Sequence, residues 1–223
     1  MKLYSGPLSL FSRKVEIALH EKGLDFDREM VAFTQAKGYA PKHPAVLATN
    51  PKAQVPVLVD GDLTLFDSTL IFEYLEDAYP KPALWPADPK ARARGRLVEL
   101  TADEVLLPLV ARFMHRSEPP DSDAQRRERR DAEATLAESA LSARYSQIAD
   151  QLKGRDYFCG TFSYADIAMF MMLFWALRLK GPRLGSAPVL EDWYERVGSR
   201  PAVAKVAAEI IAADRRLSPD LYA

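Results

Sequence analysis

The chain has 223 residues, of which 48% are hydrophobic, and this is enough for one large domain or two small ones around a real core. Its 30 basic and 31 acidic residues leave a net charge of -1, which excludes an overall field that would gather nucleic acid or an anionic membrane. The longest apolar run, residues 167–177, is shorter than the roughly 20 residues that cross a bilayer. A single cysteine, Cys159, rules out an intrachain disulfide and fits a reducing cytoplasm. We therefore expect a globular cytoplasmic protein that binds no nucleic acid and no membrane.

The first third of the chain alternates strand patterns with helix patterns. An apolar strand leads into a Gly6-Pro7 turn, and the residues after this turn repeat with helical spacing until Gly23. Asp60-Gly61 joins two short strands as a tight hairpin, and Asp67-Ser68 begins a helix. Glycine and proline interrupt residues 34–50, which are expected to be irregular apart from a helical turn near residues 45–48. The expected strands lie at residues 2–5, 26–33, 55–59 and 63–66.

The remainder of the chain reads as helix. Four prolines between residues 79 and 89 prevent regular structure and indicate a domain boundary. We therefore expect an N-terminal domain over residues 1–79, a linker over 80–90 and an all-helical domain over 91–223. Ser163 and Asp166 have the spacing of a capping box before an apolar helix. The expected helices cover residues 91–113, 124–152, 167–177, 190–197 and 203–211, and Arg126 to Arg130 are expected on a solvated helix face.

Several short motifs occur in an order and spacing that resemble the cytosolic glutathione transferase family. They are Ser9 to Leu19 (SLFSRKVEIAL), Lys42-His43-Pro44, Asn50-Pro51, Gln54-Val55-Pro56, Asp67-Ser68 and Ser163-Tyr164-Ala165-Asp166. The resemblance covers nearly the whole chain and is greatest for serine-type members of bacterial or plant type, such as the theta, tau and zeta classes. It implies a thioredoxin-like α/β domain that binds glutathione and an all-α domain that lines the pocket for a second substrate.

The resemblance assigns the catalytic hydroxyl to Ser9, which lies eight residues before Ile17 as the activating serine of the family does. Ser12 is the alternative, although it could equally cap the helix. Arg13 could strengthen the local field, but an exposed position is commoner for arginine in a first helical turn. A thiol with a pKa of about 8.5 is only roughly 3% ionised at pH 7, and lowering that pKa by about two requires about 2.7 kcal/mol. One hydrogen bond to a charged acceptor contributes roughly 1.5–3 kcal/mol, so one serine can supply most of the effect.

The resemblance also implies the residues that hold glutathione, which is the co-substrate. Ser68 would bind the γ-glutamyl carboxylate at a helix start and Asp67 the amine, although a plain helix cap explains the same pair. A cis bond between Val55 and Pro56 would leave the Val55 backbone free to pair with the cysteinyl residue. The glycyl end would be reached by Gln54 and by Lys42, which could instead be a mobile surface lysine.

The second-substrate pocket is expected to contain Leu10, Arg112, Phe113 and Met114 and to take a small hydrophobic electrophile. The three histidines show no spacing typical of metal ligands, so no metal is expected. Cys159 is expected to be buried and inert.

Three functions are compatible with the resemblance. The first is a glutathione transferase of detoxification type, acting as a homodimer. The second is a glutathione-dependent isomerase of the zeta kind, which Ser9-Leu10-Phe11-Ser12 disfavours because it lacks that class's Ser-Ser-Cys sequence. The third is a binding module that keeps the fold without turnover. Thiol transfer is disfavoured because residues 6–12, which we call the opening turn, contain no cysteine.

Overall fold

The computed structural model describes residues 1–222, and the chain divides into two compact units. Residues 1–84 together with 201–219 form the first unit. The second unit consists mainly of residues 85–200. The two units are an α/β unit and an all-helical unit, which confirms the fold class expected from the sequence.

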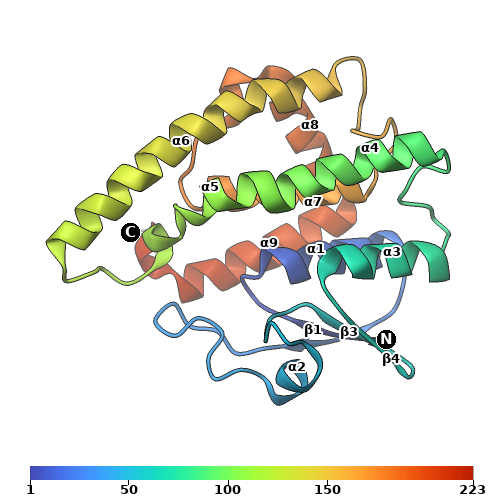
Figure 1. Ribbon diagram of the computed structural model, residues 1–223, viewed down its shortest axis with the longest axis horizontal. Helices are drawn as coiled ribbons and strands as arrows, with labels where there is room; N and C mark the ends of the chain where they lie inside the picture. The colour runs from blue at the N-terminus through green and yellow to red at the C-terminus, as the bar shows by residue number, and fades with distance from the viewer. Residues whose placement is uncertain (223) are drawn as a thin grey trace. The chain divides into compact units, whose positions relative to one another are not determined.

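The first unit is built on a mixed sheet with strand order β2-β1-β3-β4 (Figure 1). β1 is parallel to β2 and antiparallel to β3, which in turn is antiparallel to β4. Helices α1, α3 and α9 lie on one face of this sheet and α2 lies on the other (Figure 1). The strands are β1 (Lys2–Ser5), β2 (Asp27–Met30), β3 (Val57–Asp60) and β4 (Leu63–Phe66). The helices are α1 (Leu10–Glu21), α2 (Pro44–Thr49), α3 (Ser68–Ala78) and α9 (Pro201–Leu217).

The second unit consists of helices in the part of the chain that the structure describes. Helix α6 has the bounds expected from its sequence pattern, whereas the expected continuous helix over residues 91–113 is interrupted. A π-helical segment follows α4, and Pro108, which has no N–H to donate, stands in the first turn of α5. The elements are α4 (Pro89–Leu100), η1 (Thr101–Leu106), α5 (Leu107–Ala111), η2 (Met114–Ser117), α6 (Ala124–Leu152), α7 (Tyr164–Arg178), η3 (Leu184–Ser186) and α8 (Pro188–Gly198).

Helix α7 is the centre of the second unit and is buried from residue 164 to residue 176. The expected capping box is present: the Asp166 carboxylate accepts the backbone N–H of Ser163 at 2.9 Å. It also accepts the indole N–H of Trp193 at 2.9 Å, which ties the start of α7 to α8. Burial raises the pKa of Asp166. No helix within residues 1–222 is long and apolar enough to cross a membrane.

Helix α9 belongs to the first unit, whereas the sequence placed all residues after 91 in the helical domain. Its apolar positions Val203, Val206 and Ile210 are buried. Glu209, on the same helix, forms ion pairs with Arg13 of α1 and Arg28 of β2. Both ion pairs join segments more than 180 residues apart, so the local sequence pattern of α9 carries no sign of them.

Candidate functional site

The strand register gathers three turns at one end of the sheet. β1 pairs with β3 so that Tyr4 stands opposite Val57, and continuing this register places Gly6 opposite Val55. β3 pairs with β4 so that Val57 stands opposite Phe66, which places Ser68 beside Val55 in the same way. The turn that carries Ser9, the turn before β3 and the start of α3 therefore meet at this end.

Ser9 is half-buried and is the N-cap residue of α1. Its Oγ accepts the backbone N–H of Ser12 at 3.2 Å, and this bond uses the oxygen without using the hydroxyl proton. The side chain also stands at the N-terminal end of a 12-residue helix, where the helix dipole favours negative charge. A hydroxyl in this position can donate a hydrogen bond to an anion in front of the helix.

Ser12 is completely buried and has a structural role. Its Oγ accepts the backbone N–H of Gly6, and its hydroxyl donates to the Oγ of Ser5, both at 3.0 Å. The hydroxyl of Ser5 is also hydrogen-bonded to the buried carboxylate of Glu16. These bonds fix the start of the opening turn, and the geometry favours Ser9 over Ser12 as the hydroxyl that faces a ligand.

Arg13 is buried to 2% exposure, whereas the sequence placed it on the exposed face of the first helical turn. Its guanidinium bonds to Glu16 at 2.6 Å and to Glu209 at 3.1 Å. Arg28 contacts the same two carboxylates. The two arginines and two glutamates form a closed network under the opening turn, because a buried arginine requires opposite charge.

The turn before β3 contains a cis bond between Val55 and Pro56, as the family resemblance implied. Within the described residues, the backbone N–H and C=O of Val55 make no intramolecular hydrogen bond. Gln54 is exposed beside them, and its own carbonyl accepts the side-chain N–H of Asn50 at 2.6 Å. Lys42 is exposed in the segment before α2. The turn thus presents one free backbone donor and one free backbone acceptor at the end of the sheet.

Asp67 caps α3, and Ser68 is its first residue. One carboxylate oxygen of Asp67 accepts the backbone N–H groups of Thr69 and Leu70 at 3.0 and 3.4 Å. The second oxygen lies 3.8 Å from the ammonium group of Lys52. Asp67 has a φ of 77°, in the left-handed region that residues other than glycine seldom adopt. Ser68 is buried at the N-terminus of an 11-residue helix, a position that favours an anionic group.

The spacing of the three turns matches an extended tripeptide. Neighbouring strands lie about 4.8 Å apart, so the ends of β1 and β4, which have β3 between them, are separated by about 10 Å. An extended chain of three residues spans about 10 Å. A carboxylate at the start of α3 and a thiolate at the start of α1 would each lie at a positive helix end.

Tyr39 supports the opening turn, and the sequence did not single it out. Its hydroxyl accepts the backbone N–H of Leu8 at 3.3 Å, and its ring packs against Phe33 with 4.6 Å between centroids. A Cβ atom on Gly6 would lie only 2.4 Å from the Tyr39 hydroxyl, so a glycine is needed there for this close packing. A glycine such as Gly6 can indicate that another group packs closely against the backbone. Tyr39, however, lies in residues 34–50, where no hydrophobic periodicity predicts its position.

The four residues expected around the second substrate differ in exposure. Arg112 and Met114 are exposed, and the Arg112 guanidinium pairs with Glu133 at 2.8 Å. Leu10 and Phe113 are buried in the cores of their own units and present almost no open surface. Phe113 packs beneath Arg116, whose guanidinium lies 5.0 Å from the ring centroid. The second-substrate pocket remains a prediction.

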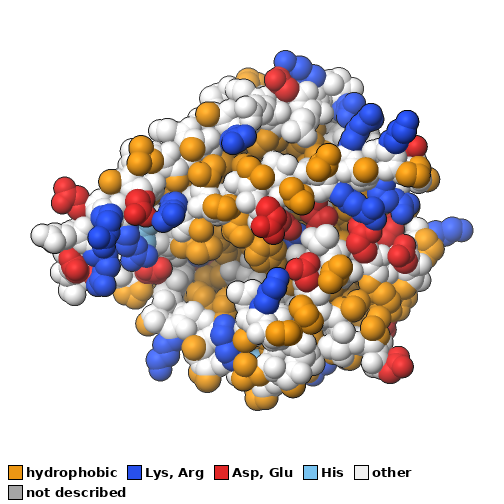
Figure 2. Space-filling model, in the orientation of Figure 1, with side chains coloured by type: hydrophobic (Ala, Val, Ile, Leu, Met, Phe, Trp, Pro, Cys, Tyr) orange, Lys and Arg blue, Asp and Glu red, His pale blue; other side chains and the backbone are white. Residues whose placement is uncertain are grey.

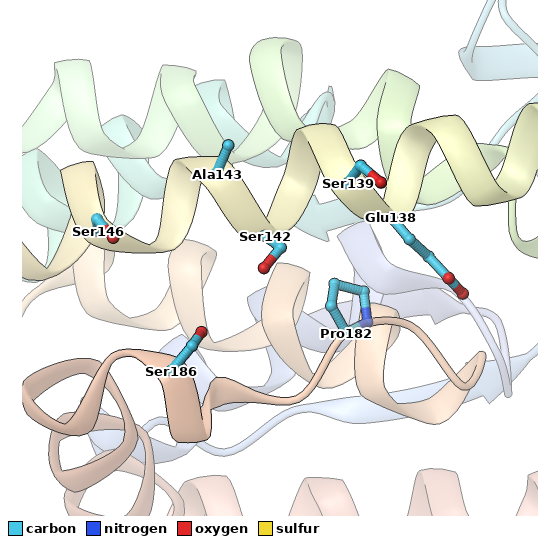
Figure 3. Close-up of a pocket in the computed structure, with 7 residues that line it drawn as sticks. All are labelled: Glu138, Ser139, Ser142, Ala143, Ser146, Pro182 and Ser186. Carbon is cyan, nitrogen blue, oxygen red and sulfur yellow. The ribbon is translucent and has the colours of Figure 1, made fainter.

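A separate groove of about 460 Å³ lies in the second unit between α6 and the segment that carries Pro182 and Ser186 (Figure 3). Ser142 points from α6 toward that segment. The charged side chain on this groove, Glu138, is paired with Arg116 at 2.6 Å. Serine hydroxyls without a base or a free charge offer hydrogen bonds and no catalytic group.

Charges of both signs are interspersed on the face of the molecule shown in Figure 2. At the start of α6, Arg130 pairs with Glu118 at 2.6 Å and Arg126 pairs with Asp121. Within residues 1–222, no group of three or more histidine, cysteine, aspartate or glutamate side chains is placed to hold a metal ion. Cys159 is partly buried, and burial raises the pKa of its thiol.

Known sequences resemble this chain over different lengths. A stringent starvation protein A homolog of Coxiella burnetii is 44% identical over 100 residues, which are 44% of this chain and 44% of that protein. The maleylacetoacetate isomerase of Pseudomonas aeruginosa is 46% identical over 97 residues, which are 43% of this chain and 45% of that protein. Both matches span less than half of the relative. Glutathione S-transferase 3 of Zea mays is 30% identical over 219 residues, which are 94% of each chain.

Solved structures resemble the chain over nearly its full length. A glutathione S-transferase from Rhodospirillum rubrum has a TM-score of 0.77 and 28% identity, with 92% of this chain and 90% of that chain covered. One from Methylobacterium radiotolerans, in complex with glutathione sulfonate, has a TM-score of 0.70 and 27% identity over 92% of this chain and 93% of that chain.

A thioredoxin-like α/β unit followed by an all-helical unit is the fold that this chain shares with the solved glutathione S-transferases. Residues 3–83 match the glutathione S-transferase N-terminal domain, and residues 98–201 match the C-terminal domain of the same family. The chain belongs to the glutathione S-transferase family, as the sequence motifs indicated.

Proposed function

We propose that the protein is a glutathione transferase that activates the glutathione thiol with Ser9 for attack on small hydrophobic electrophiles. The main support is the geometry of Ser9: its oxygen is held by Ser12 while its proton is available, at the positive end of α1. Family membership supports the use of glutathione. The other two turns at this end of the sheet offer complementary groups for the rest of the tripeptide.

In the proposed binding mode, Ser68 and the start of α3 hold the γ-glutamyl carboxylate, and Asp67 holds the amine through its second oxygen. The free backbone groups of Val55 pair with the cysteinyl residue, and Gln54 and Lys42 serve the glycyl end. The Ser9 hydroxyl donates its proton in a hydrogen bond to the thiolate, which stabilises the ionised form without transferring a proton. The thiolate attacks the electrophile and forms a thioether, and the leaving group departs or the carbanion takes a proton from water.

A conjugation assay with a chloronitroaromatic electrophile tests this function. Ser9→Ala removes a hydrogen bond to a charged group, which contributes about 1.5–3 kcal/mol, so kcat/KM should fall roughly 10- to 100-fold. Ser9→Gly should lose as much activity, although glycine is a better N-cap than alanine. Ser9→Thr keeps the hydroxyl and should keep most of the activity. An unchanged rate in both hydroxyl-free variants would contradict the proposal.

Two other functions remain candidates, because some relatives carry names other than glutathione transferase. The similarity to a maleylacetoacetate isomerase supports a glutathione-dependent cis–trans isomerase, although the opening turn lacks the Ser-Ser-Cys sequence. The name of the stringent starvation protein A homologs states no enzymatic activity, so a module without turnover is the other candidate. Calorimetric titration with glutathione separates these cases, because no binding at millimolar ligand favours the module. Turnover of maleylacetoacetate without net consumption of glutathione favours the isomerase.

We also propose that the protein acts as a cytoplasmic homodimer, as the family resemblance implies. Leu97 and Leu100 support a protein partner for α4, because these leucines are 62% and 53% exposed on that helix. Light scattering after size exclusion should return about twice the chain mass of 25.0 kDa. A mass equal to one chain would contradict the dimer.

A further inference from the structure

A small cavity of about 260 Å³ lies in the first unit, where the C-terminal end of α1 meets α9. The two helices lie side by side in this unit (Figure 1). The wall of the cavity comes from the last turn of α1, the turn after it, β2 and α9, and Leu24 and Phe26 form its apolar part. The volume is just below the roughly 300–1,000 Å³ of sites for drug-sized ligands, so the cavity suits a smaller molecule.

Four charged side chains line this cavity, and two of them neutralise each other. Arg28 and Glu209 form an ion pair across it. Asp25 and Lys205 are exposed, and neither side chain forms a hydrogen bond or an ion pair with another residue that the structure describes. Asp25 belongs to the turn after α1 and Lys205 to α9. The cavity therefore has one uncompensated negative charge and one uncompensated positive charge, on different elements of its wall.

His20 adds a neutral polar group between these charges. It stands in the last turn of α1 and lines the cavity, with its ring 5.2 Å from that of Phe26. Burial lowers the pKa of His20, and the positive charge of Lys205 lowers it further, so the imidazole is neutral at pH 7. Its ring nitrogens form no hydrogen bond within residues 1–222. A neutral imidazole offers one donor and one acceptor and repels neither sign of charge.

We propose that this cavity binds a small α-amino acid with an apolar side chain. The α-ammonium group pairs with Asp25, and the α-carboxylate pairs with Lys205 and accepts the ring N–H of His20. The side chain of the ligand packs against Leu24 and Phe26. A ligand with a single charge would leave either the acid or the base of the cavity without a partner, so the wall selects a zwitterion. The site is made by the first unit alone and requires neither glutathione nor turnover.

Titration of the full chain with L-leucine, followed by saturation-transfer NMR in the absence of glutathione, tests this site. Leucine should bind with a dissociation constant of about a millimolar, which is typical for a ligand of this size. Two analogues keep its side chain and one charge each: 3-methylbutylamine lacks the carboxylate, and 4-methylpentanoate lacks the ammonium group. Each should bind roughly fivefold more weakly, which is the effect expected of an exposed ion pair.

Matched variants assign each charge of the ligand to one residue. Asp25→Asn should weaken leucine binding roughly fivefold without weakening the binding of 4-methylpentanoate, which has no ammonium group. Lys205→Gln should weaken leucine binding by as much without weakening the binding of 3-methylbutylamine. Asp27→Asn on β2 and Arg215→Gln on α9 are the controls, because these exposed residues do not line the cavity. Both controls should bind leucine as wild type does.

The γ-glutamyl end of glutathione also carries an α-ammonium and an α-carboxylate group, so leucine could enter the proposed glutathione site instead. Asp67→Asn separates the two sites and should leave leucine binding unchanged. Loss of leucine binding in this variant would overturn the proposal. The proposal is also wrong if leucine gives no signal at about 10 mM, or if either analogue binds as tightly as leucine. Equal affinities in Asp25→Asn, Lys205→Gln and the two controls would refute it as well.

Discussion

The Oγ of Ser9 accepts the backbone N–H of Ser12 over 3.2 Å, and this bond separates the roles of two serines that lie three residues apart. Ser12 is buried and holds the opening turn through Gly6 and Ser5. Ser9 is half-buried and keeps a hydroxyl proton at the positive end of α1. The structural and the proposed chemical function of this turn therefore belong to different residues, which makes them separable by mutation.

Ser12→Ala should lower stability without changing the chemistry of the thiol. The buried backbone N–H of Gly6 loses its acceptor at 3.0 Å, and an unsatisfied buried donor costs about 1–3 kcal/mol. Urea unfolding should show this loss, while the pKa of enzyme-bound glutathione should stay at its wild-type value. A large rise of that pKa in a folded Ser12→Ala variant would show that Ser12, and not Ser9, ionises the thiol.

Asp67→Asn separates the cap of α3 from the proposed contact with the glutathione amine. The asparagine oxygen can still accept the N–H groups of Thr69 and Leu70, and asparagine tolerates the positive φ at this position. The melting temperature should therefore change little. Losing one charge at the ligand amine should weaken glutathione binding about tenfold by calorimetry. Asp62→Asn, at the exposed hairpin tip, is the control and should bind glutathione as wild type does. If Asp67→Asn bound glutathione as tightly as this control, Asp67 would not belong to the glutathione site.

Glu209→Gln should destabilise the protein in a manner that depends on pH. Burial alone would raise the pKa of Glu209, but the hydrogen bonds and positive charges of Arg28 and Arg13 outweigh it and hold the pKa below the ordinary value of 4.5. The folded state therefore gains stability from the ionised carboxylate above pH 4.5, and this gain is lost as the pH falls through the lower folded-state pKa. At pH 7 the variant should lose about 1–3 kcal/mol, because the buried Arg13 keeps only one partner.

Unfolding of Glu209→Gln and of wild type at a series of pH values checks this account. The stability difference should shrink steadily below pH 4.5. Glu195→Gln, on the exposed side of α8, is the control and should match wild type throughout. A difference that is constant with pH, or that grows in acid, would mean that Glu209 does not act through its charge.

The sequence predicted most reliably those features that depend on neighbouring residues. Helix α6 has its expected bounds of 124 and 152, because its amphipathic repeat is long and Asp123 caps its start. The expected hairpin of β3 and β4 is present, although its two-residue turn is Gly61-Asp62 and not Asp60-Gly61, because Asp60 still pairs with Leu63; Gly61 has a φ of 62°. The motifs also placed the chain in its family. In each case the signal lies within a few residues of the structure that it predicts.

The features that the sequence missed depend on contacts between distant segments. Arg13 is buried between Glu16, three residues away, and Glu209, which lies 196 residues away and could not be inferred from the residues near Arg13. The position of α9 beside α1 follows from the same ion pairs. Tyr39 packs against Gly6 in the opening turn but belongs to a segment without hydrophobic periodicity. The glycine itself was therefore the one sequence feature that pointed to a close contact there. The second-substrate residues were inferred from family position alone, and two of the four are buried.

The pKa of the thiol of bound glutathione, measured from thiolate absorbance across pH in wild type and Ser9→Ala, tests the central claim most directly. The account predicts a wild-type value about two below that of free glutathione, and a value in Ser9→Ala that returns most of the way to that of the free thiol. Glutathione affinity should change much less than the thiol pKa. Equal thiol pKa values in the two proteins, with glutathione bound to both, would contradict the assignment of Ser9.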